Sequence, residues 1–138
     1  MLTNEFQFPR KLATQLLHYA QISPETEICG LIGSLNELPV SCYPVDNADR
    51  HPETRFLLDP KQQIAAMAAM RQRNEKLFAI YHSHPTAPAM PSKTDIQMAT
   101  YPDTLYLIIS LNTKGVLEMR GFKMRAGLVD EVILTLRQ

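Results

Sequence analysis

The chain has 138 residues, of which 45% are hydrophobic and 20% are charged. This length suffices for one domain that buries about two-thirds of the surface its unfolded form exposes, and we expect residues 1–138 to form a single domain. Lys plus Arg and Asp plus Glu number 14 each. Because no net positive field is available to hold phosphates, nucleic acid and an anionic membrane are excluded as expected partners.

The first twenty residues, MLTNEFQFPRKLATQLLHYA, carry charges among their apolar positions and lack the continuous apolar core of a signal peptide. No apolar run elsewhere approaches the roughly 18 residues of a membrane span. Cys29 and Cys42 are typical of buried thiols in a reducing compartment, although one disulfide between them stays open. We therefore expect a cytoplasmic protein that is neither exported by this route nor inserted in a membrane.

The N-terminal third predicts a helix followed by a β-hairpin. Apolar residues recur at helical spacing over residues 9–22. The short apolar segments 27–35 and 40–46 are joined by a turn, which is typical of two antiparallel strands. Pro44 favours an edge position for the second strand, because proline cannot donate to a neighbouring strand.

The middle of the chain predicts two further helices and a strand. Asp59 followed by Pro60 has the form of a helix cap and first helical residue, so a second helix is expected over residues 60–75. Residues 76–84 follow as a strand. Ser92 is expected to begin a third helix that reaches about Thr100.

The C-terminal part predicts strands over residues 104–111, 116–124 and 129–136, with a turn at 112–115 and a helix as the alternative for the last segment. The expected fold class is α/β, with a single mixed, largely antiparallel sheet flanked by about three helices.

The segment YHSHP, at the end of the strand over residues 76–84, places two histidines on one face. Side chains alternate along a strand, so His82 and His84 point the same way with Cα atoms about 6.6 Å apart, while Ser83 points the other way. Pro85 favours an extended backbone at His84 and ends the strand. Two imidazoles so placed can share one metal ion.

The segment SKTD, at residues 92–95, brings a carboxylate toward them. Ser92 and Asp95 have the spacing of a capping box, which places Asp95 in the first helical turn. Two histidines and one aspartate leave a fourth position free for water, as in catalytic rather than structural zinc sites. Singly, each residue would be an ordinary core histidine or helix cap. Their coincidence in order and spacing favours a metal site and hydrolysis.

These motifs resemble the H-x-H-P…S-x-x-D signature of the JAMM metalloproteases, the catalytically competent branch of the MPN domains, with ten residues between His84 and Asp95. The segment EICG matches the family's E-x-C-G motif and supplies its upstream glutamate as Glu27. The expected helices, hairpin, N…F-L-L-D-P segment and H-x-H strand follow the family's order over nearly the whole chain. One departure is Ser34, which follows Gly33 where the family often has a second glycine.

The resemblance implies the three-layer MPN architecture, similar to that of cytidine deaminases. It also implies that His82, His84 and Asp95 bind one Zn²⁺ ion with a catalytic water. Glu27 would be the general acid/base and Ser92 would stabilise the oxyanion.

By the same resemblance, the protein is a compact prokaryotic-type isopeptidase or peptidase. Its substrate would be a ubiquitin-like or sulfur-carrier protein that is cut after a C-terminal Gly-Gly. A zinc amidase acting on a small molecule would use the same catalytic residues, and a non-catalytic MPN scaffold would bind partner proteins, so both alternatives stay open. The sequence leaves the oligomeric state undefined.

Other residues are weaker candidates. Glu25 competes with Glu27 for the acid/base role. Cys29 could suggest a thiol hydrolase, but a cysteine next to glycine within an apolar run is typical of a buried, inert thiol. His18 and His51 are expected at the surface. No nucleotide-binding loop or H-E-x-x-H motif occurs in the sequence.

Overall fold

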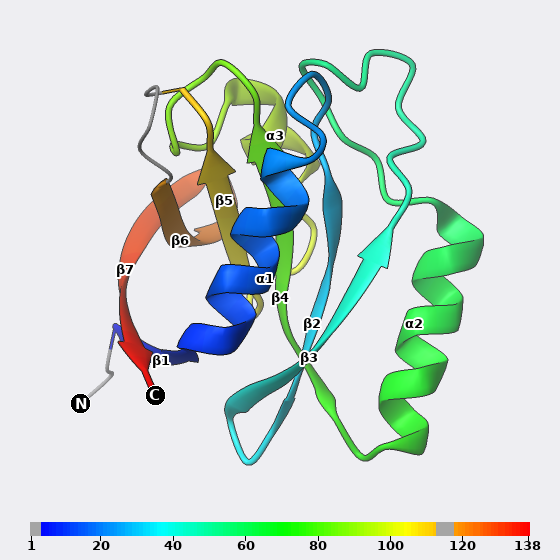
Figure 1. Cartoon of the computed structure of the whole chain (residues 1–138), viewed down its shortest axis with the longest axis vertical. Helices are drawn as coiled ribbons and strands as arrows, with labels where there is room; N and C mark the ends of the chain where they lie inside the picture. The colour runs from blue at the N-terminus through cyan, green and yellow to red at the C-terminus, as the bar shows by residue number, and fades with distance from the viewer. Residues whose placement is uncertain (1–3, 113–117) are drawn as a thin grey trace.

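The computed structural model of the protein describes residues 4–112 and 118–138. Three helices and seven strands lie in these residues (Figure 1). In chain order they are β1 (Glu5–Pro9), α1 (Arg10–Gln21), β2 (Cys29–Leu35), β3 (Leu38–Val45), α2 (Pro60–Gln72), β4 (Lys76–His84), α3 (Lys93–Met98), β5 (Leu105–Ser110), β6 (Glu118–Arg125) and β7 (Leu128–Arg137).

All seven strands join one sheet in the order β1-β7-β6-β5-β4-β2-β3. The β1–β7 and β4–β5 pairs are parallel. The other neighbouring pairs are antiparallel, including the predicted β2–β3 hairpin. The sheet is therefore mixed and largely antiparallel, and Pro44 lies on the edge strand β3 as predicted.

The strand β1 was not predicted from the sequence. Its segment EFQFP pairs with β7, with Phe6 opposite Leu134. β1 is short, and its partner strand lies at the other end of the chain. No local sequence pattern therefore predicts it. The pairing brings the first and last strands side by side (Figure 1).

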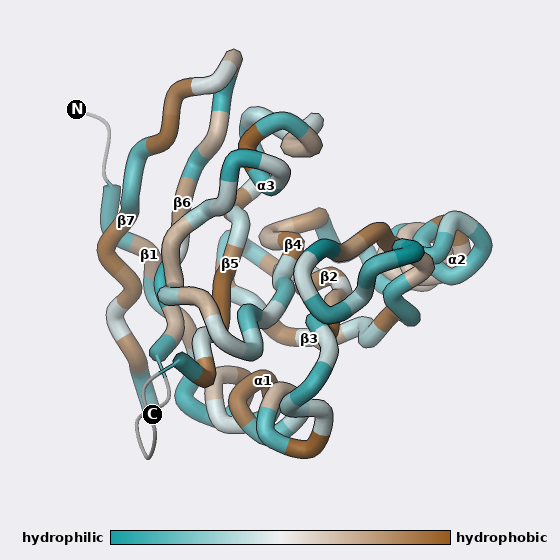
Figure 2. The backbone as a smooth tube through the Cα atoms, turned by 90° about the horizontal axis from the view of Figure 1, so that it is seen from above, coloured by the Kyte–Doolittle hydropathy of each residue, from teal (hydrophilic) through white to brown (hydrophobic). Residues whose placement is uncertain are grey.

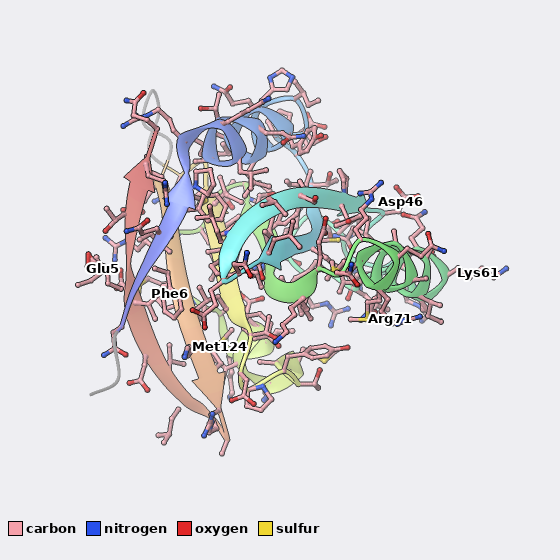
Figure 3. The ribbon with its side chains drawn as sticks, turned by 90° about the horizontal axis from the view of Figure 1, so that it is seen from below. Glu5, Phe6, Asp46, Lys61, Arg71 and Met124 are labelled. Atoms are coloured by element: carbon pink, nitrogen blue, oxygen red, sulfur yellow. The ribbon has the colours of Figure 1, made fainter. Side chains whose placement is uncertain are left out.

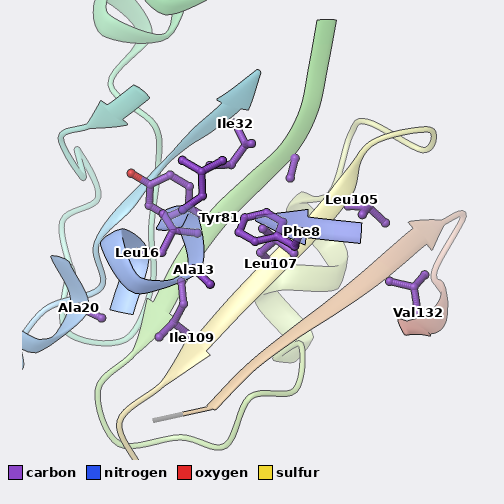
Figure 4. Close-up of a cluster of buried hydrophobic side chains, with 12 residues drawn as sticks. Phe8, Ala13, Leu16, Ala20, Ile32, Tyr81, Leu105, Leu107, Ile109 and Val132 are labelled. Atoms are coloured by element: carbon purple, nitrogen blue, oxygen red, sulfur yellow. The ribbon is translucent and has the colours of Figure 1, made fainter. Parts of the chain in front are cut away.

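Alternate residues of the central strands enter two cores, one on each face of the sheet. In β4, Ala79 and Tyr81 join a cluster with Phe8 and with Leu16 of α1 (Figure 4). Ile80 faces the other way and joins a cluster with residues of α2. Figure 2 shows α1 and α3 on opposite sides of the sheet. The protein therefore has three layers, and the predicted fold class is confirmed.

The helix α2 begins where the sequence predicts. A side-chain oxygen of Asp59 accepts a hydrogen bond from the Gln62 N–H at 3.0 Å, and Pro60 is the first helical residue. Asp46, at the end of β3, lies beside α2 (Figure 3) and is joined to the Gln62 side chain by two hydrogen bonds of 2.8 Å. These contacts fix the chain on both sides of the segment that links β3 to α2.

The helix α3 is shorter than predicted. It ends at Met98 rather than about Thr100, because Ala99 has an extended backbone with ψ 114°. The first helix, α1, agrees with the prediction to within a residue at each end.

The C-terminal segments are strands, so the helical alternative for residues 129–136 is wrong. The predicted strand 104–111 corresponds to β5, which is shorter by one residue at each end. The predicted strand 116–124 corresponds to β6 from Glu118 onward. The predicted turn at 112–115 lies outside the described residues, apart from Asn112.

Gly30 lies where β2 passes very close to its neighbours. A β-carbon at Gly30 would be 2.6 Å from the carbonyl oxygen of Tyr43 and would overlap the Tyr81 ring. Since the backbone of β3 cannot withdraw, only glycine fits this position. Further along β2, the register with β3 shifts between Gly33 and Ser34, at the position of the departure from the family pattern.

Both cysteines are free thiols, so the disulfide that the sequence left open does not form. Cys29 is buried, and the Cys42 sulfur lies 3.4 Å from the Tyr81 hydroxyl. Among the residues that the structure describes, no helix combines the length and apolar character that crossing a membrane requires.

Candidate metal centre

The end of β4 supplies two buried histidines to one face of the sheet. The Nε2 atoms of His82 and His84 lie 3.1 Å apart. Both side chains are almost fully shielded from solvent, at 0% and 2% exposure. Ser83 between them points to the opposite face, where its hydroxyl bonds to the backbone of Ile28. The alternation predicted for H-x-H is therefore present.

Asp95 reaches these histidines from the first turn of α3. The Ser92 hydroxyl oxygen accepts a hydrogen bond from the Asp95 N–H at 3.0 Å, and the Ser92 N–H donates to Asp95 Oδ2 at 2.9 Å. This capping box orients the carboxylate, so that the same Oδ2 lies 3.1 Å from Nε2 of both His82 and His84. Asp95 thus caps the helix and faces the imidazoles at once.

Three potential ligand atoms, the Nε2 atoms of His82 and His84 and the Oδ2 of Asp95, face one another in an arrangement that suits a cation. The Nδ1 of His84 lies 2.8 Å from the carbonyl oxygen of Pro88. Because a carbonyl can only accept, we assign the proton to Nδ1, which leaves Nε2 with a lone pair aimed at Asp95. A shared proton can satisfy two of the three facing atoms, whereas a divalent ion can satisfy all three.

The ionisation of these groups reflects the same arrangement. Burial alone would raise the pKa of Asp95, but the contacts of its Oδ2 with the His82 and His84 rings hold it well below its ordinary value. Burial lowers the pKa of His82. Burial also acts to lower the pKa of His84, but its hydrogen bonds to Asp95 and Pro88 outweigh burial and raise it. The site therefore favours an ionised Asp95 carboxylate facing a neutral His82 imidazole.

Glu27 completes the cluster from the segment just before β2. Its N–H donates to the carbonyl of Pro52 at 2.7 Å, and its own carbonyl accepts from the Asn47 side chain at 3.0 Å. The side chain is buried, and Oε1 has no hydrogen-bond partner in the described part of the chain. Burial raises the pKa of Glu27 to about 8, against the opposing effect of His84. The competing Glu25 is exposed and lies outside the cluster.

The donor set fits a zinc ion. One ligand atom from each of Glu27, His82, His84 and Asp95 lies within 4.8 Å of the other three. The three contacts of 3.1 Å among the histidines and Asp95 compare with about 3.3 Å between ligands of a tetrahedral zinc ion with bonds of about 2.0–2.1 Å. Two imidazoles and one carboxylate are typical of catalytic zinc, and the unpartnered Glu27 carboxyl lies beside them.

Ser92 lies next to the cluster with a hydroxyl proton that is free to donate, because its oxygen is the acceptor in the capping box. Cys29 is poorly suited to thiol chemistry, since burial raises the pKa of its thiol to about 12. His18 and His51 are exposed and lie outside the cluster, as predicted.

Two residues in contact with this site were not predicted to belong to it. The Phe56 ring stacks on the His82 imidazole, with centroids 4.3 Å apart and an angle of 18° between the rings. The Asn47 side chain bonds to the backbone on both sides of Phe56, at the Arg55 carbonyl (2.9 Å) and the Leu57 N–H (3.0 Å). The sequence contains both in the N…F-L-L-D-P segment, but spacing alone does not place an aromatic ring on a histidine.

A hollow of about 610 Å³ borders the cluster, with Glu27 and Asn47 in its lining. A second, of about 280 Å³, includes none of the four clustered residues, but its lining contains Phe56, which stacks on His82, and Tyr101. A third, of about 810 Å³, lies at the other end of β4 around Lys76 and includes none of the four clustered residues.

Comparison with known families identifies the relationship that these motifs indicate. The model of the family described as prokaryotic homologs of the JAB domain matches residues 9–123. The chain belongs to this family. This JAB-domain protein is 32% identical over 122 residues to the CysO-cysteine peptidase of Mycobacterium tuberculosis, covering 87% of this chain and 83% of the relative. It is also 41% identical over 58 residues to a probable TtuB-protein conjugate cleaving protease of Thermus thermophilus, covering 42% of this chain and 39% of the relative.

Solved structures agree with this assignment. A protein from Desulfitobacterium hafniense, solved in solution, superimposes on the JAB-domain protein with a TM-score of 0.86 and 31% identity, covering 96% of this chain and 93% of the other. A JAMM protein described as a metalloprotease-like zinc site in the proteasome and signalosome gives a TM-score of 0.62 at 16% identity over 96% of this chain and 98% of the other, and supports the fold alone. The predicted JAMM/MPN relationship is confirmed, and so is an enzyme of the hydrolase class.

Proposed function

We propose that this protein is a zinc-dependent metallopeptidase or isopeptidase that hydrolyses the amide bond after the C-terminal Gly-Gly of a ubiquitin-like or sulfur-carrier protein. The observation that carries the proposal is the convergence of Glu27, His82, His84 and Asp95 within 4.8 Å. The substrate class is supported by the names of the relatives, one a CysO-cysteine peptidase and the other a protease of TtuB-protein conjugates.

The metal would be held by His82, His84 and Asp95. Two of these residues already have partners that keep them in place, since His84 bonds to the Pro88 carbonyl and Asp95 to the Ser92 N–H. When bound, the zinc ion supplies a water of pKa about 7 and an electrophile for the substrate carbonyl.

Glu27 transfers a proton from the attacking water to the leaving amine. Its unpartnered Oε1 takes a proton from the attacking water and returns it to the nitrogen of the leaving amine. A group with a pKa near the working pH can do both, and burial raises the pKa of Glu27 to about 8. A neighbouring cation would bring this pKa down from there, toward neutrality.

Ser92 donates a hydrogen bond to the oxyanion. Its oxygen is already fixed by the Asp95 N–H, so the hydroxyl can turn its proton toward the substrate without losing the helix cap. A donor that is positioned before the charge develops costs no reorganisation during the reaction.

The cut most consistent with these relatives releases either an amino acid or the lysine of a conjugated protein from the carrier's terminal glycine. The residues that differ between a carrier peptidase and a small-molecule zinc amidase lie outside the cluster, so the amidase remains the second candidate. A scaffold without activity is disfavoured, because a buried Glu27 carboxyl whose Oε1 has no hydrogen-bond partner among the described residues carries a cost in stability that catalysis, rather than folding, would explain.

The protein with zinc would be tested on three substrates, each analysed by mass spectrometry. They are a carrier ending in Gly-Gly-Cys, a carrier joined through Gly-Gly to the side chain of a lysine peptide, and a small acyl amide. We expect release of the extension from one or both carriers with the cut after the second glycine. Cleavage of the small amide alone would favour the amidase, and cleavage of none would favour the scaffold.

We further propose that residues 1–138 form a single domain, which the one continuous sheet supports. The cytoplasmic location stays a prediction, motivated by two unpaired thiols.

A further inference from the structure

The two clustered histidines are held in different ways. A ligand histidine normally donates its second ring N–H to a partner that fixes the plane of the ring. His84 follows this rule, since its Nδ1 bonds to the Pro88 carbonyl at 2.8 Å. His82 does not, because its Nδ1 is buried and has no hydrogen-bond partner in the described part of the chain.

The His82 ring nevertheless needs an external constraint. Rotation about the bond that joins an aromatic ring to its side chain is broad and weakly restricted. A modest rotation would carry the His82 Nε2 away from the Asp95 oxygen, which lies 3.1 Å from it. The contact with His84 is edge-to-face, with ring centroids 4.9 Å apart, so these two rings do not stack in parallel.

Phe56 supplies the missing constraint. Its ring lies nearly parallel to the imidazole, at 4.3 Å and 18°, so that any rotation of the His82 ring out of its plane would run into Phe56. We propose that Phe56 is a positioning residue for the metal centre, which fixes the His82 ring by stacking where a hydrogen bond is usual. This inference rests on the proposed function, because it assumes that His82 is a ligand.

The position of Phe56 is itself fixed by the side chain of Asn47. The amide of Asn47 donates to the Arg55 carbonyl at 2.9 Å and accepts from the Leu57 N–H at 3.0 Å. These two hydrogen bonds hold the backbone on either side of Phe56. The same amide donates to the Glu27 carbonyl at 3.0 Å. One side chain therefore sets the position of Phe56 and the backbone of Glu27 together.

The test measures zinc affinity rather than cleavage. Purified Phe56→Leu and Phe56→Tyr variants would be compared with the unaltered protein by competition against a chromogenic chelator. Leu57→Ala is the matched control, because Leu57 lines the same 280 Å³ hollow as Phe56 and lies in the same segment. Thermal unfolding of the metal-free proteins would establish that each variant is folded, with Phe56→Met in place of Phe56→Leu if that variant is not.

Loss of a residue that orients a ligand typically weakens metal binding by about 10–100-fold. We expect a loss of this size for Phe56→Leu, near-normal affinity for Phe56→Tyr, which keeps the ring, and no change for Leu57→Ala. In proton NMR spectra of the metal-free protein, the upfield ring-current shift of the His82 ring protons should disappear in Phe56→Leu and persist in Phe56→Tyr.

Normal zinc affinity in a folded Phe56→Leu variant would overturn this inference and leave the proposed function intact. Equal weakening by Phe56→Leu and Leu57→Ala would also overturn it, because packing of the hollow would then explain the effect. Failure of the unaltered protein to bind zinc would instead remove the proposed function, and this inference with it.

Discussion

The hydroxyl of Ser83 accepts a hydrogen bond of 2.9 Å from the backbone N–H of Ile28, and the Ser83 N–H donates back to the Ile28 carbonyl at 3.0 Å. Ser83 lies between the two clustered histidines, and Ile28 follows Glu27. This pair of bonds therefore joins the strand that carries two proposed ligands to the residue that carries the proposed acid/base.

Replacing Ser83 with alanine should reduce turnover without releasing zinc. The variant leaves the Ile28 N–H without its acceptor, which typically costs about 1–3 kcal/mol of stability. Since small displacements of a reacting group are costly, we expect kcat to fall about tenfold or more while zinc affinity stays unchanged. Ser34→Ala is the control, because Ser34 is also buried but makes only a 3.4 Å bond, to Lys76, at the far end of β2. Equal kcat values for Ser83→Ala and Ser34→Ala would contradict this account.

Replacing Glu27 with glutamine should abolish cleavage while zinc remains bound. The amide cannot accept and return a proton, and general acid/base groups typically contribute about 10²–10⁴-fold to the rate. Zinc content measured by metal analysis should stay near one ion per chain. The matched control is Glu25→Gln, at an exposed position outside the cluster, where activity should be retained. If Glu25→Gln abolished cleavage and Glu27→Gln did not, the acid/base assignment would move to Glu25.

Replacing Ser92 with alanine should lower kcat by about 10²–10³-fold, the usual cost of one oxyanion donor. It should also lower the free energy of unfolding by about 1 kcal/mol, because the cap on α3 is lost. Asp59→Ala separates the two effects. It removes the corresponding cap on α2 and should cost similar stability with kcat unchanged. A similar loss of kcat in both variants would assign the effect to stability.

The stability of the metal-free protein should depend on Glu27 as pH rises. The folded-state pKa of about 8 exceeds the ordinary value of 4.5. The stability associated with protonated Glu27 is therefore fully present below about pH 4.5 and lost as pH rises through 8. The pKa of Asp95 is lowered, so the stability that Asp95 contributes is instead lost as pH falls. A Glu27→Gln variant keeps Asp95, so comparing it with the unaltered protein isolates the effect of Glu27.

The Glu27→Gln variant should not lose stability in this way as pH rises, because glutamine does not ionise. We expect its unfolding free energy, relative to that of the unaltered protein, to increase by about 2–4 kcal/mol between pH 5 and pH 9. Urea titrations of the two metal-free proteins across this range would measure the difference. A difference that does not change with pH would argue against a buried, protonated Glu27.

Features of the site that depend on local geometry could be predicted from the sequence. The two-residue period of a strand places His82 and His84 on one face, and the capping-box spacing turns Asp95 into the first turn of α3. The close approach at Gly30 gives a physical reason for the glycine of E-x-C-G. That Glu27 lies beside these residues followed from the family resemblance alone.

Features that depend on long-range packing could not be predicted. β1 forms only because β7, at the other end of the chain, offers it an edge. The stack of Phe56 on His82 depends on how the segment before α2 folds back over the sheet. Asn47 fixes the path of that segment by hydrogen bonds to its backbone, and backbone partners cannot be predicted from a pattern of side chains.

Dependence of cleavage on a bound metal tests the central claim most directly. The protein would be incubated with a carrier extended beyond Gly-Gly, first as purified, then after removal of metal by a chelator, and finally after addition of one equivalent of zinc. We predict cleavage after the second glycine, loss of activity on chelation and recovery with zinc, with no recovery in a variant that lacks His82. Undiminished cleavage by the protein after its metal has been removed would contradict the account.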